Sequence, residues 1–298
     1  MDKYDEKYVF NAFGLMNTGA ICYLNSFLQM LSSLTCFNKK VLENEEYMKK
    51  TLTGNAMYNF IKSCYDKTEI SSHSTKILEA LVKDLSTRRP NVQFGVGQES
   101  ASEAFMHLLD MMEVDGEEKL LTDLFMHRVM NRTVCVNCEK TVSEIRERNT
   151  IFNLFYMDGQ LNKVPENEEE FSDSIKIHYG EVKDFTCPNC NKQTTCLRKC
   201  NLTFLPEIIV CCFNVYNVKK THYFSPQLSF SSKGTGKKLK YNIVSQVEHF
   251  GSLGGGHYIA KVLRKDGVYL ANDSSFDRSE ISPNANTYII AYHYFDTV

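Results

Sequence analysis

A cysteine near the start of the chain opens a strongly amphipathic helical pattern. Cys22 lies in the segment GLMNTGAICYLNSFLQMLSSL, and large apolar residues follow it at positions 24, 27, 28, 31 and 34. This spacing predicts a helix over residues 22–34 with one buried face. Amide groups at the N-terminus of that helix would favour a thiolate at Cys22. Upstream, the side-chain amide of Asn17 could donate a hydrogen bond to an oxyanion.

A thiolate nucleophile needs a general base, and the far end of the chain offers His257. This histidine follows the glycine run Gly254–Gly256 and opens the strand-like segment Tyr258–Val262. Two antiparallel strands joined by a turn at residues 265–267 would return the chain to Asn272. The amide oxygen of Asn272 would then accept a hydrogen bond from the imidazole and select its tautomer.

Each of these residues also has a simpler interpretation. A single buried cysteine is usually an inert small hydrophobe. A histidine in a glycine-rich loop often has no catalytic role. His249 is a second candidate base, although no glycine run precedes it. Taken singly, neither Cys22 nor His257 establishes catalysis.

Four cysteines in the middle of the chain have the spacing of metal ligands. Cys135 and Cys138 form one C-x2-C pair, and Cys187 and Cys190 form a second. Each pair can present two thiolates to one ion, so together they predict a tetrahedral Zn²⁺ site. Four thiolates leave no position for water, which makes the site structural. Reduced structural thiols and redox exchange are the alternatives.

Two segments also match the sequence boxes of a known family. The first segment agrees with Gly-Leu-x-Asn-x-Gly-x-x-Cys-Tyr-x-Asn-Ser-x-x-Gln at Gly14, Leu15, Asn17, Gly19, Cys22, Tyr23, Asn25, Ser26 and Gln29. The second agrees with Gly-Gly-His-Tyr and a later Asn-Asp-Ser element at Gly255, Gly256, His257, Tyr258, Asn272, Asp273 and Ser274. In these boxes the chain resembles the ubiquitin-specific proteases, papain-like cysteine peptidases that remove ubiquitin from proteins.

The resemblance implies an α+β fold arranged as the thumb, fingers and palm of a right hand. It places a mainly helical thumb at about 14–115, fingers that run into palm strands at 124–215, and the palm at 216–298, all in one catalytic domain. The four metal-type cysteines would form a zinc ribbon at the tip of the fingers, which grip the body of ubiquitin in the family. Phe152, Leu154, Leu202 and Leu205-Pro206 occupy positions of the family's finger and palm strands.

The resemblance also implies roles for individual residues. Cys22 would attack the carbonyl of the modifier's terminal glycine, His257 would transfer the proton, Asn272 would orient the histidine, and Asn17 would hold the oxyanion. Asp273 is a second candidate for polar support near the oxyanion or the histidine. A narrow channel beside the glycines, with Gly255, Gly256 and Tyr258 among the substrate-binding residues, would admit only a Gly-Gly tail.

A third segment, QESASEAFMHLLD from Gln98 to Asp110, matches the family's substrate-tail box only in part. Gln98 and Glu103 agree with it, whereas Ser100 replaces an aspartate. Acidic residues here help the family to bind the arginine-bearing tail of ubiquitin, by carboxylate–guanidinium pairing. Glu103 could take this role and Glu99 could compensate for Ser100, although both are otherwise ordinary solvent-facing residues. The chain also lacks tryptophan.

Composition limits the classes of function. The 298 residues carry 34 basic and 36 acidic side chains, which gives no global field for nucleic acid or an anionic membrane. No apolar run approaches the roughly 20 residues that span a bilayer, and the N-terminal sequence MDKYDEKYVF is too polar for a signal peptide. We expect a monomer in the cytosol or nucleus that binds neither nucleic acid nor membrane.

Apolar periodicity predicts helices at 56–65, 74–86 and 100–113, and strands from about 124 to 215 and from 241 to 298. The acidic stretch at 165–173 is expected to be a solvated loop. Together with these elements, the resemblance implies a cysteine-type deubiquitinase that cleaves after the C-terminal Gly-Gly of ubiquitin. The alternatives are a protease for another ubiquitin-like modifier, a non-catalytic ubiquitin-binding module, and a zinc-ribbon nucleic-acid binder.

Overall fold

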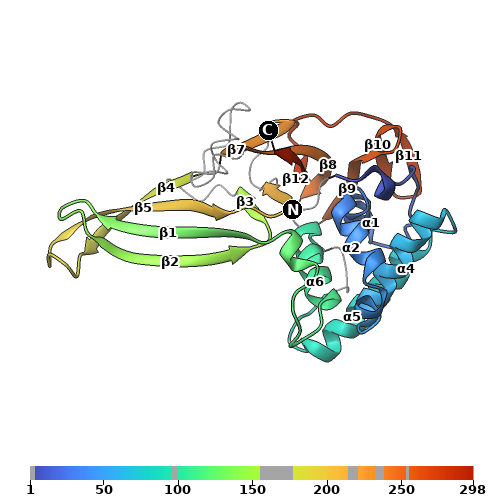
Figure 1. Cartoon of the computed structure of the whole chain (residues 1–298), viewed down its shortest axis with the longest axis horizontal. Coiled ribbons are helices and arrows are strands. Elements are labelled where there is room, and N and C mark those ends of the chain that lie inside the picture. Colours follow the sequence, from blue (N-terminus) through green and yellow to red (C-terminus); the bar gives the residue numbers. More distant parts are fainter. Residues whose placement is uncertain are drawn as a thin grey trace.

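The computed structural model describes residues 4–94, 99–154, 177–213, 221–231, 238–252 and 255–297. Helices gather on one side, one sheet forms the body beside them, and a second, narrow sheet projects far from both (Figure 1). This is the α+β arrangement that the sequence predicts. We call the projecting four-stranded sheet the fingers sheet and the eight-stranded sheet the palm sheet. The subdomain boundaries at 115, 124 and 215 stay predictions.

The helical part comes first in the chain and contains the predicted helices. Its elements are η1 Glu6–Tyr8, α1 Cys22–Leu31, α2 Thr35–Glu43, α3 Glu45–Met48, α4 Leu52–Asp66, α5 His73–Arg88, α6 Ala101–Met112 and η2 Thr122–Leu124. Among the described residues, no helix has the length and the apolar run that crossing a membrane requires.

The helix predicted over residues 22–34 is wrong in its extent, because α1 ends at Leu31 and a new helix begins at Thr35. The Ser32 hydroxyl donates to the carbonyl of Gln29 at 2.9 Å, and the Ser33 hydroxyl donates to that of Met30 at 2.6 Å. Such bonds offer the last carbonyls of a helix an alternative to continued helical pairing. The apolar residue at position 34 therefore packs from outside α1.

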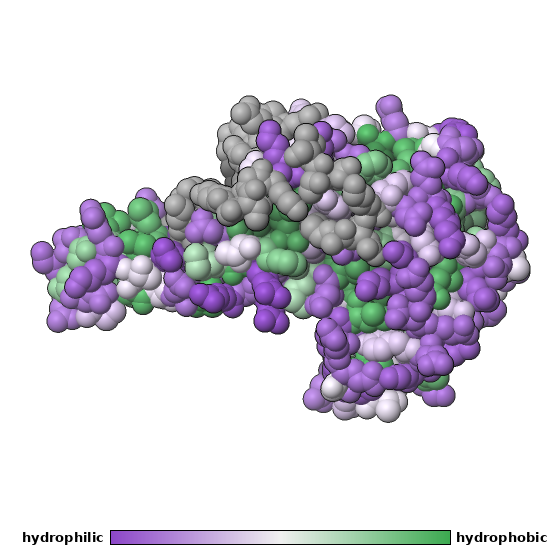
Figure 2. Space-filling model, in the orientation of Figure 1, coloured by the Kyte–Doolittle hydropathy of each residue, from purple (hydrophilic) through white to green (hydrophobic). Residues whose placement is uncertain are grey.

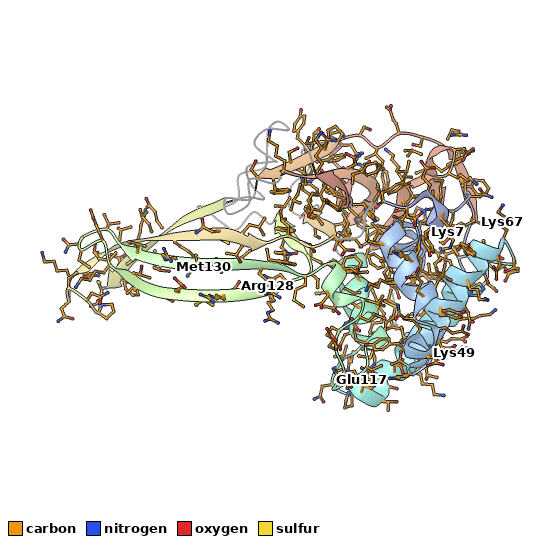
Figure 3. All side chains as sticks on the ribbon, in the orientation of Figure 1. Lys7, Lys49, Lys67, Glu117, Arg128 and Met130 are labelled. Atoms are coloured by element: carbon orange, nitrogen blue, oxygen red, sulfur yellow. The ribbon has the colours of Figure 1, made fainter. Side chains whose placement is uncertain are left out.

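The fingers sheet is antiparallel and has the strand order β2-β1-β5-β4. Its strands are β1 His127–Cys135, β2 Thr141–Asn149, β4 Ile177–Thr186 and β5 Gln193–Phe204. Pairing places Arg128 opposite Arg148 and Arg132 opposite Glu144 on one face. Arg128 and Met130 are labelled on β1 in Figure 3, and Figure 2 shows polar and apolar residues mixed along this sheet.

The palm sheet has the order β11-β10-β9-β8-β12-β6-β3, and β7 pairs with β8. Its strands are β3 Phe152–Leu154, β6 Ile208–Phe213, β7 Gln227–Ser231, β8 Lys238–Ser252, β9 Gly255–Arg264, β10 Gly267–Asn272, β11 Ser275–Arg278 and β12 Thr287–Thr297. Every residue of β6 is buried, as expected for a strand covered on both faces.

Helix α1 lies between the palm sheet and the other helices, and all ten of its residues are buried. A buried arginine on β9 holds its C-terminal end. Arg264 donates from Nη2 to the Gln29 carbonyl at 3.2 Å and to the Ser32 hydroxyl at 3.0 Å. Because a cation is favourable at a helix C-terminus, this contact fixes α1 on the strand that carries His257.

Candidate active site

Cys22 is the first residue of α1, as the sequence predicts, and only 4% of it is exposed. The first turn of α1 contains no acidic side chain. The amide groups of that turn and the helix dipole therefore act on the sulfur without an opposing carboxylate from the same turn.

The predicted hairpin is confirmed, because β9 pairs with β10 in antiparallel register, with Gly267 opposite Arg264 and Ala271 opposite Ala260. At its open end, Nε2 of His257 lies 2.7 Å from Oδ1 of Asn272. An amide oxygen can only accept a hydrogen bond, so Nε2 carries the proton in this pair. Nδ1 of the neutral ring is then the nitrogen available to take a proton. The strand that bears it, β9, packs against α1.

Asp273 joins the two sequence boxes. It lies in the turn between β10 and β11 with a left-handed φ of 48°. One carboxylate oxygen accepts from Nδ2 of Asn17 at 2.9 Å, and the other accepts from Nδ2 of Asn25 at 2.7 Å. The backbone carbonyl of Asp273 also accepts from the amide of Leu15 at 2.8 Å. Asp273 therefore touches the candidate oxyanion donor and not the histidine.

Asn17 is oriented from both sides of its amide. Its Oδ1 accepts from the backbone N–H of Gly19 at 3.1 Å, while Nδ2 donates to Asp273. An amide nitrogen carries two hydrogens, so this contact uses one of them and leaves a second for a developing oxyanion. Asn17 is exposed, as a residue that meets substrate must be.

Sequence reasoning missed the role of Asn25. It is 1% exposed, and its Nδ2 also lies 3.5 Å and 3.4 Å from the carbonyls of Leu15 and Met16. The signal was present, because an asparagine interrupts the apolar pattern of α1 three positions after the nucleophile. A buried polar side chain is expected to have a specific partner.

Glycine is required at two positions near the site. A Cβ on Gly14 would lie 2.1 Å from the carbonyl oxygen of Ser274, in the turn that holds Asp273. A Cβ on Gly256 would lie 2.4 Å from Nε2 of His249 and from the carbonyl oxygen of Phe250. The backbone approaches closely at both positions, so a side chain at either would force it to move.

His249, the second candidate base, lies beneath that glycine. It is 5% exposed on β8, and its ring centroid is 4.4 Å from that of Tyr258. Burial, and secondarily the electrostatic influence of the neighbouring His257, lower the pKa of His249. A ring enclosed in the palm sheet is poorly placed to meet a substrate, so the geometry favours His257 as the base.

The structure describes only some of the residues that the sequence predicts to bind the substrate's tail. Gln98 and the acidic stretch 165–173 lie outside the described residues. Glu103 is exposed in the first turn of α6, and its Oε1 lies 3.9 Å from Nε2 of His107. The Tyr258 side chain is 2% exposed and packs inside the palm, so its side chain does not face solvent beside the glycines.

Ser100 points into the palm. Its hydroxyl lies 2.7 Å from the hydroxyl of Tyr288 and 2.8 Å from that of Ser102, which is also 2.7 Å from Tyr288. In place of the aspartate that the family carries at this position, three neutral hydroxyls hydrogen-bond to one another. Glu99 lies close enough to Tyr23, the neighbour of Cys22, for its charge to add to burial in raising the pKa of that tyrosine.

At the far end of the fingers sheet, the four predicted metal ligands come together. Sγ of Cys135 lies 4.0 Å from that of Cys190, Sγ of Cys138 lies 3.8 Å from that of Cys187, and all four lie within 4.8 Å of one another. Tetrahedral thiolates at the usual Zn–S length of about 2.3 Å stand about 3.8 Å apart. The four sulfur donors and their spacing therefore fit Zn²⁺.

The two C-x2-C segments fold alike. After each pair comes a residue with a left-handed backbone, Glu139 with φ 56° and Asn191 with φ 52°. Their amides donate to the carbonyls of Cys135 and Cys187 at 2.9 Å and 2.8 Å. The amide of Asn189 points at the Cys187 sulfur from 3.4 Å. Donors of this kind orient thiolate ligands and stabilise their charge.

Comparison with curated proteins finds three informative relatives. Ubiquitin carboxyl-terminal hydrolase 26 of Arabidopsis thaliana is 27% identical over 271 residues, covering 84% of this chain and 24% of that protein. Ubiquitin carboxyl-terminal hydrolase 36 of Drosophila virilis is 24% identical, covering 94% and 25%. Ubiquitin carboxyl-terminal hydrolase 37 of Homo sapiens is 24% identical, covering 74% and 24%. The chain spans about a quarter of the length of these relatives.

Among solved structures, a chain of the SAGA DUB module with Ubp8, Sgf11, Sus1 and Sgf73 bound to monoubiquitin superposes with a TM-score of 0.78 at 17% identity. The match covers all of this chain and 72% of that one. The same assembly bound to ubiquitin aldehyde gives a TM-score of 0.74. These likenesses show the papain-like, right-hand fold that the sequence predicts. The sequence model of the ubiquitin carboxyl-terminal hydrolases matches residues 13–292, nearly the whole chain, and this protein therefore belongs to that family.

Proposed function

We propose that this chain is a cysteine-type deubiquitinase with Cys22 as nucleophile and His257 as general base. The observation that carries the proposal is the hydrogen bond of 2.7 Å between His257 and Asn272, on the strand pair that packs against the helix opened by Cys22. It combines an oriented imidazole with a thiol at a helix N-terminus, which is the arrangement of an activated cysteine nucleophile.

In the proposed reaction, the Cys22 thiolate attacks the carbonyl carbon of the modifier's terminal glycine. The second amide hydrogen of Asn17 stabilises the oxyanion, while Asp273 holds that amide in place. His257 has taken the thiol proton of Cys22 on Nδ1, and it gives this proton to the leaving amine as the C–N bond breaks, so that a thioester remains. Water, deprotonated by His257, then attacks the thioester and releases the carboxylate and the thiol.

We propose ubiquitin as the modifier, since the family model and the ubiquitin-bound structures of similar fold point to it. The glycines at 255 and 256 open β9 beside the catalytic histidine, where a Gly-Gly tail would pass. A ubiquitin-like modifier is the second candidate, favoured by Ser100, because neutral hydroxyls stand where the family has a carboxylate for an arginine.

We further propose that the four clustered cysteines hold one structural Zn²⁺. The ion would tie the hairpin of β1 and β2 to that of β4 and β5, at the end of a sheet whose strand β2 is exposed along most of its length. Because the fingers sheet has little hydrophobic core of its own, a bound metal ion would stabilise its fold. A monomer in the cytosol or nucleus is also proposed, together with the absence of nucleic-acid binding.

The test is labelling with activity probes. The chain is incubated with ubiquitin and with several ubiquitin-like proteins, each carrying a thiol-reactive group at its C-terminus. Cys200, which lies on β5 of the fingers sheet, supplies the control. We expect ubiquitin to label the wild-type chain and the Cys200→Ser variant, and not the Cys22→Ala variant. Labelling by a different modifier would reassign the substrate. If none of the probes labelled the chain, or if Cys22→Ala kept full turnover, the assignment as a thiol protease would be refuted. A non-catalytic binding module would then remain.

A further inference from the structure

A fifth cysteine lies against the metal-type cluster. Cys196 on β5 is the direct partner of Cys135 on β1. Both residues have no exposed surface, and together with Cys187 they form a small buried cluster separate from the main core. The four-thiolate site is complete without Cys196, so this thiol has no part in the function proposed above.

The hydrogen bonds around Cys135 show which type of strand pair it forms with Cys196. The amide of Cys135 donates to the carbonyl of Lys140 at 3.1 Å, away from β5. The next amide, that of Val136, donates to the carbonyl of Thr195 at 3.1 Å, toward β5. Cys135 and Cys196 therefore face each other in a non-hydrogen-bonded antiparallel pair.

Such a pair has the geometry that a disulfide needs. Its Cα atoms stand about 4.5 Å apart with both side chains on the same face. A disulfide joins Cα atoms about 4.4–6.8 Å apart. The two sulfurs can therefore bond without a shift of either strand.

Cys200 shows that this placement is particular to Cys196. It lies on the same strand and the same face of β5, four residues further on, and its partner on β1 is Asn131. A thiol at that position has no cysteine opposite it on β1. Cys200 is consequently a matched control within the same element.

We propose that Cys135 and Cys196 form an oxidative modification site, at which a hydroperoxide converts the pair into a cross-strand disulfide and releases the metal. A metal-bound thiolate is held deprotonated and is therefore nucleophilic toward peroxide. The Cys135 thiolate attacks the terminal oxygen of the peroxide, whose O–O bond breaks, giving a sulfenic acid and an alkoxide, or hydroxide when the oxidant is hydrogen peroxide. The Cys196 thiol then displaces the sulfenic hydroxyl as water, so two electrons have moved from two sulfurs to one peroxide.

The disulfide removes one of four thiolates from the metal site. Three thiolates would bind Zn²⁺ less tightly than four, so the site would lose its hold on the ion, and the segments at 135–138 and 187–190 would no longer be joined through it. The new covalent bond still joins β1 to β5, which keeps the centre of the fingers sheet paired. Oxidation would thus replace a metal link between the two hairpins of the fingers sheet with a disulfide between β1 and β5. Reduction by a dithiol in the presence of added Zn²⁺ would reverse the change.

This inference rests on the metal site of the proposed function, and the experiment separates the two. Zinc in the purified full chain is first quantified by atomic emission. The chain is then treated with hydrogen peroxide, released Zn²⁺ is followed with a chromophoric chelator, and disulfides are mapped by mass spectrometry without reduction. We expect one ion to be released together with a Cys135–Cys196 cross-link. Absence of zinc before oxidation would contradict the metal site, and the disulfide map would then decide on this pair alone.

Variants give the kinetic test. Cys196→Ser, which leaves all four ligands in place, should release zinc about tenfold more slowly than wild type, because an adjacent thiol acts at a high effective concentration. Cys200→Ser should match the wild type. Equal release rates in Cys196→Ser and wild type would overturn the proposal. So would a wild-type map that contains only bonds within the two C-x2-C pairs.

Discussion

The replacement Gly14→Ala tests how the two ends of the chain are joined at the active site. A Cβ at this position would lie 2.1 Å from the oxygen, 2.5 Å from the carbon and 2.8 Å from the Cα of Ser274. All three are backbone atoms, so no side-chain rotation can make room. The turn between β10 and β11 must therefore move away from the segment that precedes α1.

The structure sets the size of the effect. Forcing a methyl group into a packed contact costs about 1–3 kcal/mol, and losing the hydrogen bond from Leu15 to Asp273 adds about 1 kcal/mol. The expected destabilisation is thus about 2–4 kcal/mol. Unfolding gains about 2.1 cal/mol/K for each of the 298 residues, so the melting temperature should fall by about 3–6 °C.

Catalysis should suffer more than stability. The displaced turn carries Asp273, which positions Asn17, and it directly follows Asn272, which orients His257. A misplacement of about 1 Å in a catalytic group can cost about 100-fold in rate. We therefore expect kcat on a fluorogenic C-terminal ubiquitin derivative to fall by about two orders of magnitude.

Gly19→Ala is the control, because its Cβ would meet nothing within 4 Å in the same segment. Melting is followed by scanning calorimetry and turnover by fluorescence. The reasoning would be refuted if Gly14→Ala matched the wild type in both measurements, or if Gly19→Ala lost as much stability as Gly14→Ala.

Three further predictions follow from the same geometry. Asn272→Ala should lower kcat about 10- to 100-fold with little change in KM, because a hydrogen bond to the charged imidazole contributes about 1.5–3 kcal/mol; steady-state kinetics that show only a raised KM would contradict the orienting role. Burial lowers the pKa of His127 to about 4. The free energy of unfolding should therefore be highest above the unfolded pKa of about 6.5, and it should fall by about 1–2 kcal/mol by pH 5, because only the unfolded chain protonates the histidine there. Urea unfolding at pH 7.5 and 5 should show this loss reduced in His127→Phe, whose ring can keep the stacking on Phe152, and an equal loss in both proteins would count against it. Removal of zinc by a chelator should lower the melting temperature and the strand signal in circular dichroism, and an unchanged melting temperature after verified metal loss would rule out a structural site.

Local pattern was enough to predict most of the elements. Apolar spacing located α4, α5 and α6, glycines and alternation located the hairpin of β9 and β10, and the two C-x2-C pairs predicted the cluster of four cysteines. These signals are local because helical and strand periodicity act over a few residues. The prediction failed at the end of α1, where serine hydroxyls compete for carbonyls and the apolar pattern continues into a second helix.

By itself, the sequence determined which residues are the candidates for chemistry, because cysteine, histidine and asparagine in two short boxes, and paired cysteines between them, have few other uses in combination. Only the tertiary structure decided what those residues touch. Asp273 accepts a hydrogen bond from Asn17, 256 positions away in the sequence. Cys196 lies opposite Cys135 in the fingers sheet. Arg128 lies opposite Arg148 there, although the chain as a whole has almost no net charge. The physical reason is that an apolar pattern specifies which side of an element is buried, whereas strand order and register follow from the packing of the whole molecule.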